Sequence, residues 1–349
     1  MIKLEARPEI ANSMIYGAPL LAVALTLIAG MMLFNILGVN ALEALRIFFI
    51  DPVTSKRGIA ELFLKATPLI LIGVGLSFGF RAGVWNIGAE GQFIIGGLAG
   101  GSVALLFYEV DSIFVLPLML IAGTAGGMLW ACLPAFFKTR FNANEILTSL
   151  MLVYVANLLL SLLIHGPLKD PDGYSFPESR LFHDAALIPT LLGTRLHYGA
   201  FAALIIVGVA WLILSKHIAG FHFKTIGQAP RAAAFAGVNP KKIVWASFMI
   251  SGAGAGLAGI FEVAGPIGQI VPSISPGYGF TAIIVAFLGR LHPVGILLAG
   301  LVLALSFLGG EAAQVQLNMP NAVTGIFQGM LLFFLLAADV LVKYRFVFK

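Results

Sequence analysis

Polar side chains able to do chemistry are few in this sequence, and the densest group lies at Arg81–Phe93 (RAGVWNIGAEGQF). Asn86, Glu90 and Gln92 stand here among helix-breaking glycines, between two long apolar runs. A charge at the centre of a membrane costs about 2.5–3.5 kcal/mol on insertion scales, so such a group usually faces protein or water. We expect a re-entrant element whose polar side chains lie near the path of a solute. The alternative is that Glu90 pairs with Arg81 and locks an inner turn.

A second group, Asn144 and Glu145, opens an apolar run in the stretch FNANEILTS. Asn is a good helix N-cap, and the helix dipole favours a carboxylate in the first turn, so capping is the simpler interpretation. A place near the solute path is the alternative. Phe280, together with uncharged amides such as Gln269, would suit a polar neutral solute that carries hydroxyls or a ring. These residues fit a nucleoside or a sugar without choosing between them.

The third polar stretch, Lys224–Lys242 (KTIGQAPRAAAFAGVNPKK), separates two long apolar segments. Pro230 suits the first turn of a short helix, and Gly237 suits the left-handed residue that ends it. Asn239 and the proline after it are typical of the start of the next helix. The stretch predicts a short helix outside the membrane, which is either an ordinary loop or a docking element.

No catalytic constellation accompanies these groups. The sequence contains no GxxxxGK[ST] loop for nucleoside triphosphates, no HExxH metal motif and no GxSxG nucleophile motif. None of its six histidines pairs with another at metal-ligand spacing, and one cysteine, Cys132, leaves no disulfide within the chain. We therefore expect this chain to be no enzyme and to bind no cofactor or metal itself.

The composition indicates which elements position these groups. Of the 349 residues, 59% are hydrophobic and only 11% are charged, whereas a soluble protein carries roughly 25% charged residues. Ten apolar runs recur, most of the roughly 17–25 residues that a crossing helix needs, but the eighth, Phe280–Leu288, is short. Small residues spaced four apart, as in SGAGAGLAG at 251–259, predict close helix packing. The predicted fold is all-α: one polytopic membrane helical bundle over residues 1–349, with the eighth segment broken or re-entrant.

The charges predict the orientation of the ten runs. With the N-terminus in the cytoplasm, every inner connection carries Lys or Arg, and acids such as Glu109 and Asp170 fall outside. Cytoplasmic loops carry such an excess of basic residues, so the formal net charge of +5 calls for no nucleic-acid partner. Both termini and residues 224–242 are then cytoplasmic. Residues 38–58, with an amphipathic helix at Ala41–Ile50, and residues 165–195 form outer loops, which are either connectors or a platform for an extracytoplasmic partner.

Four stretches together resemble a known family. They are RAGVWNIGAEGQFIIGGLAGG, NANEILTSLMLVYVAN, GQAPRAAAFAGVNPKK and GYGFTAIIVAFLGRLHPVGILLAG. The sequence looks like a permease subunit of bacterial ABC importers of the ribose, simple-sugar and nucleoside type. It is most similar to the longer permease of nucleoside importers, over nearly the whole chain from Ile59 to Lys343.

The resemblance implies a permease for a small polar solute, above all nucleosides, in the bacterial cytoplasmic (inner) membrane. It implies three partners: a second permease subunit, a cytoplasmic ATPase that binds ATP and Mg²⁺, and a substrate-binding lipoprotein outside. Import of ribose or another simple sugar, or a self-contained secondary transporter, are the alternatives. The match to the family's cytoplasmic coupling helix carries over Gly227, Gln228, Pro230, Arg231, Ala232, Ala233 and Gly237. The acidic residue usual in this region is absent, which leaves Arg231 as the ionic candidate.

Overall fold

The computed structural model describes residues 2–6, 12–173, 176–191, 193–320 and 322–348. The chain divides into two compact units, one of residues 63–301 and one formed by residues 1–62 together with 302–349. The helices α3 (Lys56–Arg81) and α12 (Pro293–Leu317) contribute to both units, because each contains a unit boundary.

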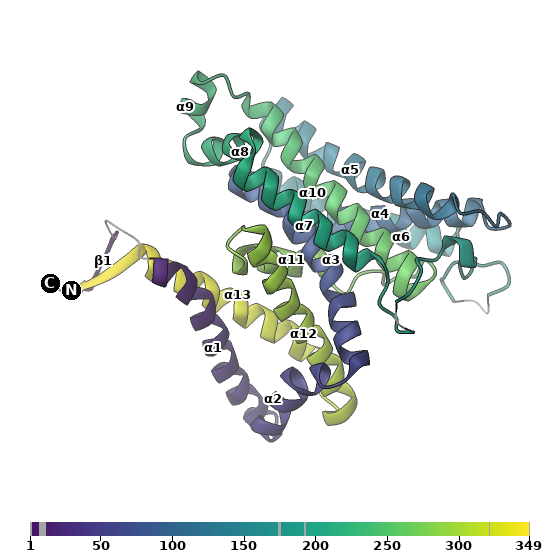
Figure 1. Ribbon diagram of the computed structural model, residues 1–349, viewed down its shortest axis with the longest axis horizontal. Helices are drawn as coiled ribbons and strands as arrows, with labels where there is room; N and C mark the ends of the chain where they lie inside the picture. Colours follow the sequence, from purple (N-terminus) through teal and green to yellow (C-terminus); the bar gives the residue numbers. More distant parts are fainter. Residues whose placement is uncertain (1, 7–11, 174–175, 192, 321, 349) are drawn as a thin grey trace. The chain divides into compact units, whose positions relative to one another are not determined.

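The larger unit is a helical bundle in which α8 and α9 lie at one end and the long connection after α6 lies at the other (Figure 1). Between α3 and α12 the chain forms, in order, α4 (Ala89–Leu106), α5 (Val115–Phe141), α6 (Glu145–His165), η2 (Asp184–Ala186), α7 (Gly199–Lys216), α8 (Ile218–Gln228), α9 (Pro230–Phe235), α10 (Pro240–Glu262), η3 (Val263–Ile267) and α11 (Tyr278–Leu288).

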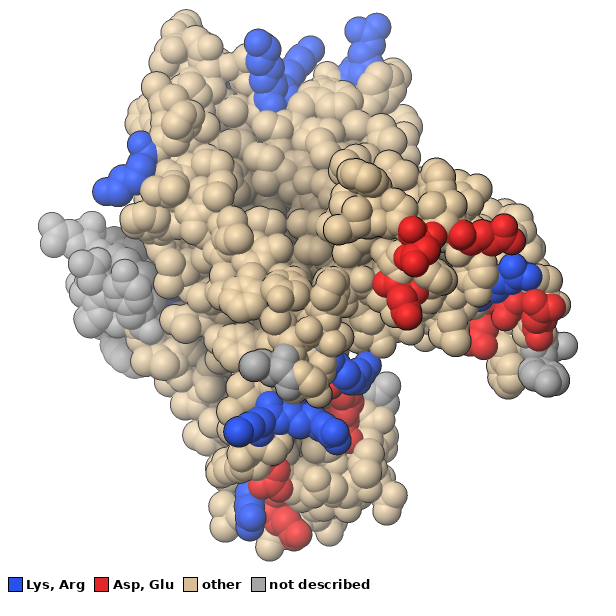
Figure 2. All heavy atoms as spheres, turned by 45° about the vertical axis from the view of Figure 1, so that its right-hand side comes forward, with Lys and Arg blue, Asp and Glu red and all other residues tan. Residues whose placement is uncertain are grey.

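Charges separate between the two ends of this unit. The α8–α10 end carries Lys224, Arg231, Lys241 and Lys242, whereas the long connection after α6 carries several Asp and Glu residues. Figure 2 shows Lys and Arg side chains at the top of the molecule and a separate group of Asp and Glu side chains toward its right. This separation supports the orientation predicted from the sequence, with the α8–α10 end on the basic, cytoplasmic side.

Three helices of the larger unit, α4, α5 and α10, approach one another at their glycines (Figure 1). A methyl group on Gly96 would collide with the backbone of Gly256, and one on Gly127 would collide with the carbonyl oxygen of Gly252. Such close approach is typical of membrane helices, because their packing in lipid depends on van der Waals contact. The predicted close packing through small residues spaced four apart is confirmed.

The helix α11 is too short to cross a membrane. Its 11 residues rise about 16 Å, roughly half of the hydrocarbon core of about 30 Å. It follows the π-helical turn η3 and residues 268–277, which form no regular structure. The eighth segment is therefore a half-helix, as its short apolar run predicts.

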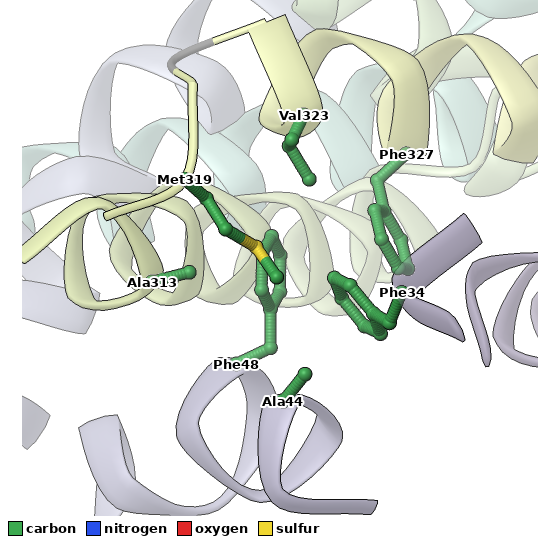
Figure 3. Close-up of a cluster of buried hydrophobic side chains, with 7 residues drawn as sticks. All are labelled: Phe34, Ala44, Phe48, Ala313, Met319, Val323 and Phe327. Carbon is green, nitrogen blue, oxygen red and sulfur yellow. The ribbon is translucent and has the colours of Figure 1, made fainter. Parts of the chain in front are cut away.

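In the smaller unit, the predicted amphipathic helix packs against the first and the last of the chain's apolar helices. It contains α1 (Asn12–Ile36), α2 (Ala41–Phe49), η1 (Asp51–Val53), the end of α12, and α13 (Ala322–Lys343). The side chain of Asn40 caps α2 by accepting the N–H of Leu42 at 3.0 Å. On the buried face of α2, Phe48 stacks on Phe327 of α13 with 4.8 Å between ring centroids, inside the apolar cluster of Figure 3. The predicted amphipathic helix is confirmed.

Eight described helices are long and apolar enough to cross a membrane: α1, α3, α4, α5, α6, α7, α10 and α12. The two shorter apolar helices are α11 and the described part of α13, Ala322–Ala338. These ten positions match the ten predicted apolar runs, so the polytopic helical bundle is confirmed. One feature was not predicted: β1 (Ile2–Ala6) and β2 (Tyr344–Phe348) pair as an antiparallel ribbon that joins the two ends of the chain.

Candidate functional site

The predicted polar group at the start of α4 forms a buried hydrogen-bond network centred on Asn86. Its Nδ2 donates to Oε1 of Gln92 at 2.9 Å and to the hydroxyl of Ser251 on α10. Its Oδ1 accepts the N–H of Gly88 at 3.0 Å. Asn86 and Gln92 are 3% and 1% exposed, and buried amides need such partners because leaving them unpaired is costly. The network therefore fixes the non-helical connection between α3 and α4 against α10.

A second contact fixes the same connection against α6. The hydroxyl of Ser149, one turn into α6, accepts the N–H of Ile87 at 3.1 Å. At the start of α6, Asn144 accepts the N–H of Ile146 at 2.9 Å, which confirms its interpretation as a cap. Glu145 forms an ion pair with Lys138 at 2.9 Å, joining the start of α6 to the end of α5. Asn144 and Glu145 thus hold a helix turn, and their place near a solute path stays a prediction.

Glu90, in the first turn of α4, caps the N-terminus of the half-helix α11. Its Oε2 accepts the N–H of Gly279 at 2.6 Å, and its carboxyl group also accepts the N–H of Phe280. The carboxyl group further hydrogen-bonds with the hydroxyl of Ser275. Glu90 is 5% exposed, so these contacts take the place of water. A carboxylate at this position also complements the positive end of the helix dipole.

Ser275 completes the cap of α11. Its hydroxyl oxygen accepts the N–H groups of Gly277 and Tyr278, each at 3.1 Å. Together with Glu90 it satisfies the four N–H groups at the start of the helix, which have no partner inside it. Such satisfaction is required at membrane depth, because an unpaired backbone group costs several kcal/mol where water is absent.

The other end of α11 is held by Arg81, the last residue of α3. Nε of Arg81 donates to the carbonyl oxygen of Leu291 at 3.0 Å. Leu291 and Arg290 both adopt left-handed backbone conformations, with φ of 55° and 57°, which non-glycine residues rarely do. The alternative in which Arg81 pairs with Glu90 is wrong within the described residues: the two side chains bind opposite ends of α11.

One side of α11 is left uncovered. Phe280 is 41% exposed, and Phe287, two turns further on, is half-buried. Trp85 of the α3–α4 connection is 38% exposed and stacks on Phe287 with 5.7 Å between ring centroids. Trp85 directly precedes Asn86 in the α3–α4 connection, and Phe280 lies in the first turn of α11, whose N–H groups Glu90 binds.

The predicted coupling stretch consists of α9 and the last turns of α8, because α8 continues to Gln228. Gly237 has a φ of 84°, so the predicted left-handed stop after α9 is confirmed. Within α9 only Ala233 is buried, while Arg231 and Ala232 are exposed and Phe235 is 95% exposed. A side chain on Gly227 would collide with the carbonyl oxygen of Arg81, so α8 packs directly on the end of α3.

Sequence reasoning missed three of these residues. Ser251 carries no local signal for its role, because its partner lies 165 residues away, whereas Ser275, three residues before Tyr278, is a Ser of the type that caps helices and was readable as one. Phe235 was readable within RAAAFA as the one large apolar side chain on an otherwise small helix. Its near-complete exposure is what marks it as a candidate contact residue.

Comparison with known proteins identifies the family. The family described as "Branched-chain amino acid transport system / permease component" matches residues 58–336. The chain is a member of this permease family. The match begins near the start of α3 and ends within α13, so it includes the polar network, α11 and the coupling stretch.

Several ABC transporter permeases are similar to this family member. A glucose ABC transporter permease protein of Haloferax volcanii is 36% identical over 355 residues, covering 99% of this chain and 93% of the relative. A guanosine ABC transporter permease protein of Bacillus subtilis is 30% identical and covers 90% of this chain and 91% of its own length. A second guanosine permease protein of that organism is 30% identical over 68% of this chain and 76% of its own. No solved structure matches the chain.

Proposed function

We propose that this permease forms the membrane path of a small neutral polar solute in an ABC importer and is driven by a separate ATPase. The observation that carries the proposal is the family match over residues 58–336, which takes in nearly all the apolar helices. ATP and Mg²⁺ bind to the ATPase, and this chain binds neither. The complex lies in the cytoplasmic (inner) membrane of a bacterium, with α8 and α9 facing the cytoplasm.

We propose α9 as the coupling helix. Its exposed face presents Arg231 for an ionic contact and Phe235 as an apolar anchor, and both residue types are frequent hot spots of protein interfaces. Pro230 begins the helix and Gly237 ends it, so its face is short and well defined. Gly227 and Gln228 connect α9 to the end of α8, through which a movement of α9 reaches the membrane bundle.

Two further partners complete the proposed importer. A second permease subunit is supported by the likeness of this chain to two different guanosine permease proteins of one organism, Bacillus subtilis. An extracytoplasmic substrate-binding lipoprotein delivers the solute to the outer face. Residues 38–58 and 165–195 are the proposed platform for it, because the charge pattern of the sequence assigns both to the outer side of the membrane.

The uncovered aromatic side of α11 is the proposed solute-facing surface. Two non-helical segments, residues 82–88 and 268–277, flank this surface. Non-helical backbone at membrane depth is tolerated only where protein or a water-filled cavity covers it. Phe280 and Trp85 therefore face the second permease or the solute path, not lipid. Asn86 and Gln92 are buried behind them and position the surface.

We propose nucleosides as the solute. Exposed aromatic rings such as Phe280 and Trp85 suit a nucleobase, since stacking on an aromatic side chain is worth about 1–3 kcal/mol per base. Two relatives named for guanosine support this assignment. A simple sugar is the second candidate, favoured by the 36% identity to a permease named for glucose.

Co-purification with the ATPase tests the docking of α9. Arg231→Glu reverses the ionic contact, and Phe235→Ala removes the apolar anchor without leaving a cavity, because Phe235 is already exposed. We expect each variant to weaken the complex about tenfold or more, which corresponds to about 1.4 kcal/mol. Phe221→Ala on α8, at a residue 62% exposed, is the matched control and leaves the affinity unchanged. Full ATPase binding and transport in both α9 variants would show that docking occurs elsewhere.

Transport by the assembled complex tests the solute and the energy source. Uptake of labelled guanosine into proteoliposomes, with unlabelled nucleosides, ribose, glucose or leucine as competitors, ranks the solute classes. We expect guanosine uptake that nucleosides reduce and leucine does not; uptake of labelled glucose without any uptake of guanosine assigns the sugar. Uptake by this chain without its ATPase, driven by a proton or sodium gradient, would instead establish a secondary transporter.

A further inference from the structure

We propose that Arg81 and Glu90 are positioning residues for transport: they hold the two ends of α11 and make this half-helix follow the movement of α8 and α9. This inference rests on the proposed function, in which an ATPase moves α9. The finding behind it concerns one short segment, residues 81–90, which runs from the end of α3 to the first turn of α4. This segment binds both ends of a helix that lies about 200 residues later in the chain.

Glu90 is the fixed end of this arrangement. It lies in the first turn of α4, and α4 packs against α5 and α10 with no room for side chains at Gly96, Gly127 and Gly256. A close-packed interface of this kind does not deform gradually. The start of α11 also touches α4 directly, because a side chain on Gly279 would collide with the backbone of Glu90. The N-terminus of α11 is therefore tied to the rigid core of the larger unit.

Arg81 is the movable end. Its side chain holds the carbonyl oxygen of Leu291 just after α11, while its own carbonyl oxygen lies against Gly227 of α8. One residue thus contacts both the end of α11 and the element that leads into α9. The α8 helix also packs on α3 through Phe223, whose ring meets Phe78 edge-on with 5.4 Å between centroids. A shift of α8 therefore reaches Arg81 directly and, through its bond to Leu291, the end of α11.

The backbone after α11 is suited to movement. Arg290 and Leu291 are two consecutive non-glycine residues in the left-handed region, a conformation that persists only where its surroundings enforce it. The bond from Arg81 to Leu291 is one side-chain contact that acts on this pair. When α8 carries Arg81 away, the pair relaxes and α11 tilts about Glu90. The tilt moves the last turn of α11 furthest and changes the exposure of Phe287, which lies in that turn.

The test measures this tilt in the full complex with its ATPase and second permease. Phe287→Cys, in a Cys132→Ala background, reports the exposure of the last turn of α11 by its rate of thiol labelling. We compare the nucleotide-free complex with the complex trapped by ATP and vanadate. In the otherwise unchanged chain we expect labelling to differ between the two states by about fivefold or more. In Arg81→Met, which removes the donor to Leu291, we expect this difference to disappear.

Three variants separate positioning from loss of structure. Arg81→Lys keeps a cation and a donor and restores part of the labelling difference. Arg140→Met, at an exposed arginine at the end of α5, is the matched control and keeps the full difference. Glu90→Gln keeps the shape of the side chain but only one acceptor oxygen. We expect the labelling difference to disappear in this variant too. If Arg81→Met fails to assemble, Glu90→Gln decides the question.

Transport without the reporter cysteine gives the second readout. We expect Arg81→Met to retain ATPase binding and ATP hydrolysis while solute moved per ATP falls at least tenfold. The inference would be overturned if both Arg81→Met and Glu90→Gln kept the labelling difference of the unchanged chain and moved as much solute per ATP. The proposed function fails in a different way, by normal ATPase binding in the Arg231→Glu and Phe235→Ala variants.

Discussion

The carbonyl oxygen of Arg81 occupies the space that a side chain on Gly227 would need. Gly227→Ala must therefore push α8 away from the end of α3, and overpacking of this kind typically costs about 1–3 kcal/mol. We expect a lower unfolding temperature in detergent. Gly208→Ala is the matched control, because Gly208 lies inside α7 with open space around it. That variant is expected to be neutral or to stabilise by up to about 1 kcal/mol.

Asn86→Leu tests the buried network. Removal of the amide takes one hydrogen-bond partner from Gln92 and one from Ser251. An unsatisfied buried polar group costs about 1–3 kcal/mol. We expect a destabilisation of this size by thermal unfolding. Asn157→Leu on α6 is the control, because Asn157 is exposed and its amide bonds only to its own helix at Val153. An equal loss in both variants would mean that the network contributes nothing specific.

Asn144→Ala tests the cap of α6. Asn144 accepts two N–H groups of the first turn, those of Ile146 and Leu147. Replacing such a cap by Ala costs about 1 kcal/mol, whereas Asp keeps the acceptor. We expect Asn144→Asp to retain the unfolding temperature that Asn144→Ala loses. Equal unfolding temperatures for the two variants would contradict a capping role.

Stability should fall at acid pH because of His197, which precedes α7. Burial lowers the pKa of His197 to about 4, and its Nδ1 accepts the N–H of Gly199 at 3.0 Å. The unfolded chain, with an ordinary pKa near 6.5, binds the proton more readily, so the folded state loses stability as the pH falls from about 6.5 to about 4. The shift corresponds to about 3 kcal/mol across this window.

Variants of two histidines isolate this effect. His197→Asn can still accept the N–H of Gly199 but does not titrate, so its unfolding temperature should vary less with pH. His217 is the control: its Nδ1 accepts the N–H of Ala219 at 3.1 Å, but the side chain is exposed. His217→Asn should leave the pH dependence unchanged. A flat profile in the unchanged chain would contradict the role of His197.

Local sequence was enough to predict the apolar helices and several helix ends. Pro230 and Gly237 bound α9, and Asn239 caps α10 by accepting the N–H of Lys241 at 3.0 Å, as their residue types predict. The expected break at residue 224 was too early, because α8 continues through Gln228. Its buried Phe223 and Ile226 keep the helical spacing across that point.

The arrangement of the candidate site was not predictable in the same way. Glu90 and Gly279 lie 189 residues apart, and the residue at the N-cap of α11, Gly277, has no side chain to show that a cap exists. A cap supplied by another helix has no signature in either segment. The sequence therefore predicted that Glu90 matters while suggesting the wrong alternative partner, Arg81.

The ribbon of β1 and β2 brings the two ends of the chain side by side, as the predicted cytoplasmic position of both termini requires. A chain whose ends share a face crosses the membrane an even number of times. The eight long described helices and α13, each long enough for one crossing, give nine, which is odd. Residues 268–291 must therefore complete a tenth, with α11 supplying only its helical half. Any rearrangement of α11 takes place within a segment that joins one side of the membrane to the other.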